Sequence, residues 1–241
     1  LEAVGHPFAL HHSNFAALPT VLAAEGTAAA DVVLADLGMS SMQVDDAGRG
    51  FSYVRDGPLD MRMDRSRGRT AADLLVTLSA EELAQALRDY GDEPEADRIA
   101  QAIVAARRQR PLRRTRELAE VVMEAVQPGQ GGRWRLHPKP GKWQAHPAAR
   151  TFQALRILVN RERGNLEQLL RVLPACLKPG GRAAVISFHS GEDRVVKAAF
   201  RDGLRAGVYS AVSPEPVRAS FAERTANPRS RSAKLRWARR I

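Results

Sequence analysis

Two apolar runs, DVVLADLG at 31–38 and GRAAVISFHS at 181–190, constrain the fold of this chain more than any other feature. Each has the length and the nearly continuous apolar character of a buried strand. The second run follows a predicted helix over 149–177 and a KPGG turn at 178–181. A helix, a turn and a buried strand form the second half of a βαβ unit, which predicts an α/β fold with a parallel sheet. FALHHSNF, at 8–15, is a further candidate strand.

The segment between the two runs is far longer than one crossover connection needs, so we expect an inserted subdomain. Three helices are indicated there: one with a capping box of Ser79 and Glu82, one with Pro94 in its first turn, and one capped by Thr115. The stretch 127–147 is rich in Gly and Pro and predicts a loop. The expected organisation is a partial core at 1–60, an inserted helical subdomain at 61–145, and the C-terminal part of the core with a basic tail at 146–241.

The net charge of +10 is unevenly distributed along the sequence. No Lys or Arg precedes Arg49, whereas six acidic residues do, so the remainder carries +16. Arginines cluster at 107–116, and arginines with a lysine cluster at 229–240. Two basic patches beside a less basic core suit a polyanion such as nucleic acid. A solvated, arginine-rich surface explains the same charges equally well.

The single cysteine, Cys176, excludes an internal disulfide and a multi-cysteine zinc site. It fits a reducing compartment, so the expected location is cytoplasmic. The uncharged stretches are too short and too polar to span a bilayer, and the first residues do not have the pattern of a secretory signal. We therefore expect no membrane association.

Asp36 and His189 lie at the ends of the two predicted strands, where open parallel sheets bind their ligands. Both therefore indicate an active-site edge, although a helix cap or a loop hydrogen bond explains Asp36 as well. His189 and Glu192 have a spacing found in metal sites, but no second ligand pair accompanies them, and no metal is expected. The sequence has no phosphate-binding loop, dinucleotide fingerprint or nucleophile elbow. The residues alone predict an α/β protein associated with nucleic acid.

The stretch DLGMSSMQVDDAGRGFSYVRDGPLDMRMD (36–64) closely resembles the signature of the ribosomal RNA small-subunit methyltransferase H family. Further similar stretches follow in the family's order, at 90–104, 115–122, 146–160, 177–197 and 227–238. The resemblance implies a Rossmann-like class I methyltransferase sheet with an inserted helical subdomain. It also implies a reaction in which S-adenosyl-L-methionine methylates the exocyclic N4 of a cytidine in 16S ribosomal RNA. The implied partner is that RNA or the small ribosomal subunit, and a homodimer is left open.

The resemblance assigns cofactor binding to Phe15, Asp36 and Gln43 and leaves the catalytic residue unknown. A core position explains Phe15 as well, and a loop amide explains Gln43. DGPLDMRMD (56–64) and SFHS (187–190) are implied to line the pocket for the target base, or else to form a turn and a strand end. The cytosine N4 lone pair is delocalised into the ring, so a hydrogen-bond acceptor near the strand ends would help to localise it. The sulfonium methyl group then needs only in-line placement.

Members of this family begin with a strand, a Gly-Gly-His loop and a second strand that ends in a ribose-binding acid. Neither the loop nor that acid occurs in this sequence. We therefore expect a chain that lacks the N-terminal cofactor-binding part and binds the cofactor weakly by itself. A non-catalytic RNA-binding fragment of the family is the alternative function. An amino-methyltransferase acting on DNA or protein is a third hypothesis, which the ordered motifs disfavour.

Overall fold

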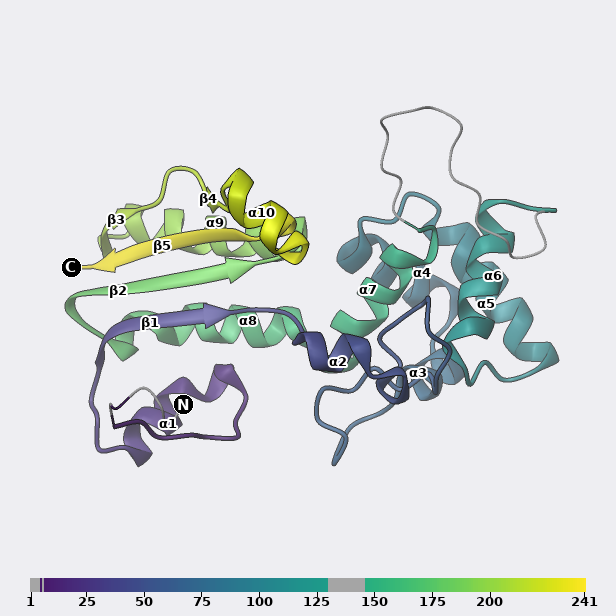
Figure 1. Ribbon diagram of the computed structural model, residues 1–241, viewed down its shortest axis with the longest axis horizontal. Helices are drawn as coiled ribbons and strands as arrows, with labels where there is room; N and C mark the ends of the chain where they lie inside the picture. The colour runs from purple at the N-terminus through teal and green to yellow at the C-terminus, as the bar shows by residue number, and fades with distance from the viewer. Residues whose placement is uncertain (1–4, 6, 130–145) are drawn as a thin grey trace. The chain divides into compact units, whose positions relative to one another are not determined.

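The computed structural model describes residue 5 and residues 7–129 and 146–241 (Figure 1). The chain divides into two compact units, which we call the sheet unit (Leu1–Gly38 and Arg163–Ile241) and the helical unit (Met39–Glu162). The sequence predicted an inserted segment at 61–145. The helical unit contains that segment together with residues on both sides of it.

Within the described residues, the sheet unit holds a five-stranded sheet of order β1-β2-β5-β3, with β4 also paired to β5. β1 and β2 are parallel, whereas β5 is antiparallel to β2, β3 and β4. The predicted α/β class is confirmed, and the sheet is mixed, with one parallel pair among the described strands. The strands are β1 (Ala30–Asp36), β2 (Leu177–Ser187), β3 (Tyr209–Val212), β4 (Val217–Arg218) and β5 (Lys234–Arg240).

β2 is longer than predicted because the KPGG segment is part of it rather than a turn before it. The register passes from Ala30 opposite Leu177 to Val32 opposite Arg182, so β2 carries extra residues in a bulge. Gly180 has φ +76°, a left-handed backbone that a residue with a Cβ adopts at a cost. The prediction of a turn at 178–181 is therefore wrong, and a bulged strand takes its place.

The helices of the sheet unit pack mainly against one face of the sheet. Leu170 of α8 and Phe200 of α9 are buried with Val185 of β2 in one apolar cluster. Along β1 the side chains alternate, so that residues 33 and 35 pack on this cluster while Val32 and Leu34 are 64% and 62% exposed. The face of β1 that carries Val32, Leu34 and Asp36 is therefore open. The helices are η2 (Phe15–Ala17), α1 (Leu18–Ala24), α8 (Glu162–Val172), η4 (Leu173–Cys176), α9 (Ser190–Arg205), α10 (Phe221–Ala226) and η5 (Pro228–Ser232).

The long helix predicted over 149–177 is wrong: the structure has two helices, α7 (Ala148–Asn160) and α8. Arg161 has φ 50°, and its N–H ends α7 by donating to the carbonyl groups of Ile157 and Leu158. The apolar spacing continues across this break, which explains why the sequence reads as one helix. The two helices serve different cores, because α7 belongs to the helical unit and nearly all of α8 to the sheet unit.

The helical unit is built around a core of residues such as Leu83, Ile99, Leu118 and Leu155. Ser40, Thr70 and Ser79 each cap the start of one of its helices, and the capping box of Ser79 and Glu82 is confirmed at 3.1 and 2.7 Å. Among the described residues, no helix of the chain is long and apolar enough to cross a bilayer. The helices are α2 (Ser41–Asp45), η3 (Ala47–Arg49), α3 (Ala71–Thr77), α4 (Ala80–Gly91), α5 (Ala96–Gln109), α6 (Thr115–Val126) and α7.

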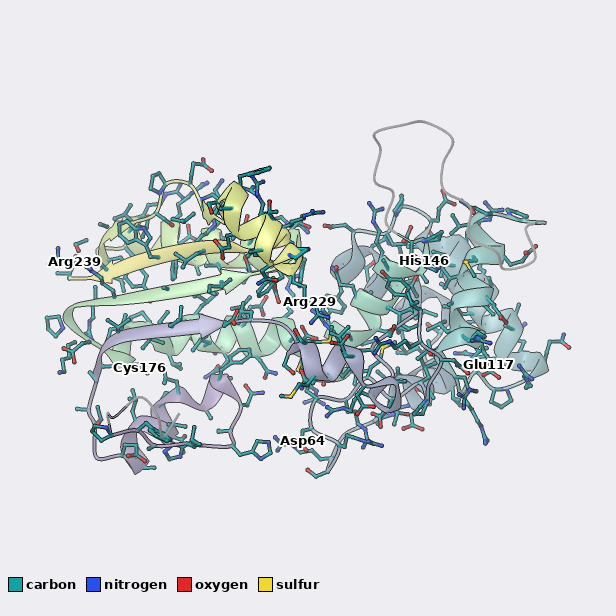
Figure 2. All side chains as sticks on the ribbon, in the orientation of Figure 1. Asp64, Glu117, His146, Cys176, Arg229 and Arg239 are labelled. Carbon is teal, nitrogen blue, oxygen red and sulfur yellow. The ribbon has the colours of Figure 1, made fainter. Side chains whose placement is uncertain are left out.

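Three other local predictions are wrong. Pro94 precedes α5 rather than lying in its first turn, and residues 8–15 form no strand, since Asn14 caps η2 instead. Thr115 does not cap α6: its hydroxyl accepts from the Gly57 N–H (3.0 Å) and donates to the Arg55 carbonyl (3.1 Å). Glu117 (labelled in Figure 2) closes the start of α6, because its carboxylate accepts the N–H groups of residues 113 and 114. The predicted loop at 127–147 falls largely outside the described residues.

Candidate active site

The carboxyl ends of β1 and β2 meet at one edge of the sheet because the two strands are parallel. Asp36 ends β1 opposite Ile186 of β2, and the N–H of Leu37 donates to the Ile186 carbonyl (3.0 Å). The chain turns at Gly38, which has φ +93°, and a Cβ there would lie 3.5 Å from the Phe188 ring. The turn after β1 and the SFHS segment after β2 therefore lie beside each other at this edge.

The carboxylate of Asp36 is exposed on the open face of the sheet. Among the described residues it has no hydrogen-bond or ion-pair partner, and the cap of the following helix α2 is Ser40. The alternative that Asp36 caps a helix is therefore wrong. A carboxylate in this position can accept hydrogen bonds from the hydroxyl or amino groups of a ligand.

His189 and Glu192 cap α9. Nδ1 of His189 accepts from the N–H of Glu192 (3.4 Å), and Oε2 of Glu192 accepts from the N–H of Phe188 (2.9 Å). Nε2 of His189 lies 3.3 Å from Oε1 of Glu192 but is not aligned for a hydrogen bond. In the part of the chain that the structure describes, no group of three or more His, Cys, Asp or Glu side chains could hold a metal ion. The His-x-x-Glu spacing is thus accounted for by the start of a helix.

A buried ion pair lies in the first turn of α9. Asp193 accepts from Nε of Arg236 (2.7 Å) and from Nζ of Lys234 (3.3 Å), which join it to β5. Burial opposes ionisation of Asp193, but the hydrogen bond and charge of Arg236, with the charge of Lys234, outweigh it and hold the pKa of that carboxyl below its usual value. Sequence reasoning missed this group because its members are far apart in the chain, although an Arg and a Lys alternating within an apolar strand are an available signal.

Phe15 begins η2 and is 41% exposed, so it is not a core residue. In Figure 1, α1 runs opposite to β1, so η2 lies at the end of α1 that is nearer the carboxyl end of β1. The side chain of Asn14 fixes the start of η2 by accepting from the N–H of Ala16 (2.8 Å). Phe15 and Asp36 therefore belong to the same unit and both are open to solvent.

Gln43 belongs to the helical unit, where it is the third residue of α2. Its Oε1 accepts from the N–H of Ser40 (3.0 Å), and its own N–H donates to the Ser40 hydroxyl (3.3 Å). The amide oxygen thus has a structural role, while the NH₂ group keeps two donors. The three residues predicted to bind a cofactor are divided between the units, with Gln43 separate from the other two.

The DGPLDMRMD segment (56–64) is held in the helical unit by side chains that form hydrogen bonds with its backbone. Nη2 of Arg49 donates to the carbonyl groups of Arg62 (2.9 Å) and Met63 (2.8 Å). Asn160 donates to the Met61 carbonyl (2.7 Å) and accepts from the Met63 N–H (2.7 Å). Met61 is fully buried with φ 62°, a strained conformation for a residue with a Cβ. Such strain persists only where the surroundings hold it, and Arg49 and Asn160 do so here.

A hollow of about 360 Å³ lies at the other edge of the sheet, between α1, η4 and the loop before β1. Its lining includes Leu22, Ala175 and Cys176, and the described residues of this lining carry no charged side chain. Cys176 is buried, and burial raises the pKa of its thiol. Because the hollow is at the amino ends of β1 and β2, it is not part of the candidate active site.

The mixed sheet, with an exposed Asp at the carboxyl edge of its parallel pair, is that of a Rossmann-like class I methyltransferase. The family model described as the MraW methylase family matches residues 1–241. The chain belongs to this family.

The chain is also similar to proteins named ribosomal RNA small subunit methyltransferase H. It is 46% identical to the one from Syntrophotalea carbinolica, over 100% of this chain and 78% of the relative. Identity is 47% to the one from Koribacter versatilis, over 96% of this chain and 69% of the relative. Identity is 45% to the one from Geobacter sp. strain M21, over 100% of this chain and 79% of the relative. The family predicted from the signature at 36–64 is therefore confirmed.

Proposed function

We propose that this chain uses S-adenosyl-L-methionine to methylate the exocyclic N4 of a cytidine in 16S ribosomal RNA. Methyl transfer follows from the family, and the names of the relatives support a substrate in the small-subunit RNA. The observation that carries the proposal is the Asp36 carboxylate. It is exposed, it is without a partner among the described residues, and it ends a parallel strand where sheets of this kind bind ligands.

The residues of the sheet unit suit the chemistry of the cofactor. The Asp36 carboxylate can accept hydrogen bonds from amino or hydroxyl groups, and the exposed Phe15 ring offers an apolar face to an adenine. Gln43 is the third proposed contact, through the NH₂ donors that its capping role leaves available. The cofactor itself supplies an activated methyl group on a sulfonium centre.

The target amine needs to be held in line with the methyl group, and it loses a proton on reaction. A carboxylate or backbone carbonyl at the edge formed by residues 36–38 and 187–190 would accept the N4–H and localise the lone pair. His189 and Glu192 are engaged in capping α9, so this role is not assigned to them. The base must leave its stack to reach such an edge. The DGPLDMRMD segment remains a proposed part of the base pocket.

The test is to incubate the chain with unmodified small ribosomal subunits and a large excess of cofactor carrying an isotopically labelled methyl group, because this chain is expected to bind the cofactor weakly. The RNA is then digested to nucleosides for mass spectrometry. The expected product is N4-methylcytidine from 16S RNA. Asp36→Asn keeps the shape and removes the charge. If Asp36 contacts only the cofactor, its KM should rise; if Asp36 also holds the amine, kcat should fall at saturating cofactor. Wild-type kinetics in this variant would exclude both roles.

A non-catalytic RNA-binding protein is the second candidate function. It is favoured by exposed arginines whose side chains have no hydrogen-bond or ion-pair partner among the described residues, such as Arg108, Arg113 and Arg116 of the helical unit. This function predicts RNA binding with no methyl transfer under conditions in which a relative is active. Label in DNA or protein rather than RNA would instead support the third hypothesis.

A further inference from the structure

A loop that closes on itself leaves the sheet at β4 and returns at β5. Arg218 of β4 pairs with Lys234 of β5, so the two ends of residues 219–233, which we call the tail loop, lie beside each other. Inside it, the hydroxyl of Ser220 caps α10, and the hydroxyl of Ser230 donates to the Asn227 carbonyl (2.8 Å). The tail loop is thus braced by its own hydrogen bonds although nearly all of it is exposed.

The tail loop and its β4 end present an aromatic ring among arginines. Phe221, the first residue of α10, is 79% exposed. Arg218, Arg224 and Arg231 are exposed too, and none has a hydrogen-bond or ion-pair partner for its side chain in the described part of the chain. A single exposed Phe is common on protein surfaces. An exposed ring and three unpaired cations on one loop and its β4 end are typical of surfaces that bind single-stranded nucleic acid, where rings stack on bases and cations contact phosphates.

The tail loop begins at the candidate active-site edge. Across the sheet, Asp36 lies opposite Ile186, Ile186 opposite Leu235, and Leu235 opposite Val217 of β4. Neighbouring strands are about 4.8 Å apart, so β4 lies roughly 14 Å from Asp36. Lys234, which directly follows the tail loop, lies opposite Ser187 at the carboxyl end of β2, and Figure 1 draws α10 near this start of β5. One RNA strand can therefore reach both places.

We propose that the tail loop binds the unpaired RNA strand next to the target base, with Phe221 stacked on a base and Arg218, Arg224 and Arg231 on phosphates. This inference rests on the proposed RNA substrate. Extruding a base for reaction removes its stacking on its neighbours, and stacking on Phe221 offsets part of that loss. The bases of an intact duplex keep their faces covered, so the contribution of Phe221 should be confined to single strands.

The first experiment measures binding of the full chain, without cofactor, to a fluorescent RNA by anisotropy. The RNA is an unstructured strand of about ten nucleotides, and a duplex of the same sequence serves as comparison. Phe221→Ala should weaken binding to the single strand about tenfold and leave duplex binding unchanged. Phe221→Trp should bind like wild type. Phe221→Leu, which keeps apolar bulk without a flat face, should bind as weakly as Phe221→Ala.

The matched aromatic control is Phe8→Ala, because Phe8 is also an exposed phenylalanine of the sheet unit. Its RNA binding should equal that of wild type. Unchanged single-strand binding by Phe221→Ala would overturn the proposal. So would wild-type binding by Phe221→Leu, because that result would indicate an apolar protein partner rather than a stacked base.

The second experiment tests the arginines by salt dependence. Gln at Arg218, Arg224 and Arg231 should reduce the slope of log K against log salt concentration by about 2, since each phosphate contact on a single strand contributes about 0.7. The control places Gln at residues 171, 182 and 201, three exposed arginines of the sheet unit without partners among the described residues. An equal loss of slope in the control would overturn the proposal. Failure of methylation alone would contradict the proposed reaction and leave this surface standing.

Discussion

Asp193 of α9 and Arg236 of β5 form a buried, two-point ion pair: Nε lies 2.7 Å from Oδ1 and Nη2 lies 3.3 Å from Oδ2. The Arg236 side chain is 4% exposed, and its Nη1 has no hydrogen-bond partner among the residues that the structure describes. Asp193 therefore supplies most of the compensation for burying this charge. Because Asp193 lies in the first turn of α9, the pair also fixes the SFHS segment that leads into that helix.

Replacing Asp193 with Asn should destabilise the sheet unit strongly, because it leaves Arg236 charged, buried and without its anion. The expected loss is about 3–5 kcal/mol in the free energy of unfolding, measured by urea unfolding and circular dichroism. Asp202→Asn is the matched control, since Asp202 pairs with Arg205 at the surface, and its loss should be less than about 1 kcal/mol. Equal losses in the two variants would contradict a special role for the buried pair.

Gly203→Ala should destabilise the contact between α9 and β3. A Cβ at residue 203 would lie 2.5 Å from Cδ2 of Tyr209, a buried ring that packs edge-on against Phe200. We expect a loss of about 1–3 kcal/mol in unfolding free energy. Burial raises the pKa of Tyr209 to about 12, so displacement of the ring should also lower that pKa in an ultraviolet titration. Gly164→Ala is the control: it meets open space within α8 and should stabilise by up to about 1 kcal/mol.

The arginines at 107–116 should differ in what they do. Arg107 donates to the carbonyl groups of Leu75 and Leu78, the latter at 2.6 Å, so Arg107→Gln should destabilise the helical unit and leave the salt dependence of RNA binding unchanged. Arg108, Arg113 and Arg116 are exposed, and their side chains have no hydrogen-bond or ion-pair partner in the described part. Gln at these three positions should leave stability nearly unchanged and reduce the salt slope by about 2 for a single strand. A wild-type salt slope in the variant of Arg108, Arg113 and Arg116 would leave these three arginines as a solvated surface.

Residues 110 and 114 are expected to contribute little to RNA binding, because their charges are already paired. Arg110 lies 2.9 Å from Glu117, and Arg114 lies 2.8 Å from Asp56. Each would have to give up its carboxylate to contact a phosphate. Charge counting along the sequence therefore overstates the number of arginines that are available.

The helical unit should lose stability as the pH falls below about 6.5. His146 (labelled in Figure 2) stacks on Tyr53 with ring centroids 4.7 Å apart, and burial lowers the pKa of the imidazole. The unfolded chain then binds the extra proton first, so protonation favours unfolding. His146→Phe keeps the ring but removes this proton, so the pH dependence of its unfolding free energy between about pH 7.5 and 5 should be shallower.

The pH dependence is the proper readout for His146, because the substitution also removes an acceptor. Nδ1 of His146 accepts from the Ala148 N–H (3.1 Å), and losing that bond lowers stability at every pH. His12→Phe serves as the control, since His12 is exposed in the sheet unit. If the unfolding free energies of wild type and His146→Phe depend on pH in the same way, folding does not change the pKa of this imidazole.

The sequence predicted β1 and β2 because each is a nearly continuous apolar run, and such runs are rare in this chain. The prediction that both strands are buried is wrong for β1, because one of its faces is open. It did not predict the break at Arg161, because no Gly or Pro marks it. There the left-handed backbone results from two helices packing into different cores. Thr115 was assigned as a cap from its place before an apolar run, whereas its hydroxyl is used by residues 55 and 57, far away in sequence.

In the candidate site, too, the sequence predicted features that depend on neighbouring residues and missed those that depend on residues far apart in the chain. Asp36 was predicted because its motif and its place at a strand end are both local features. The pair of Asp193 and Arg236 depends on residues that only the fold brings together. In the tail loop the basic charges were visible in the sequence, but the exposure of Phe221 depends on a pairing of Arg218 with Lys234 that no local pattern encodes.

The alkylation rate of Cys176 reports on local opening of the sheet unit. Its thiol is buried and the pKa of that thiol is raised, so alkylating reagents should react only when the packing around η4 opens. The chain has no other cysteine, and Cys176 belongs to the sheet unit. The labelling rate of the intact protein therefore measures how often the sheet unit opens, with no contribution from the helical unit. Asp193→Asn should accelerate this labelling, whereas Arg107→Gln should leave its rate unchanged.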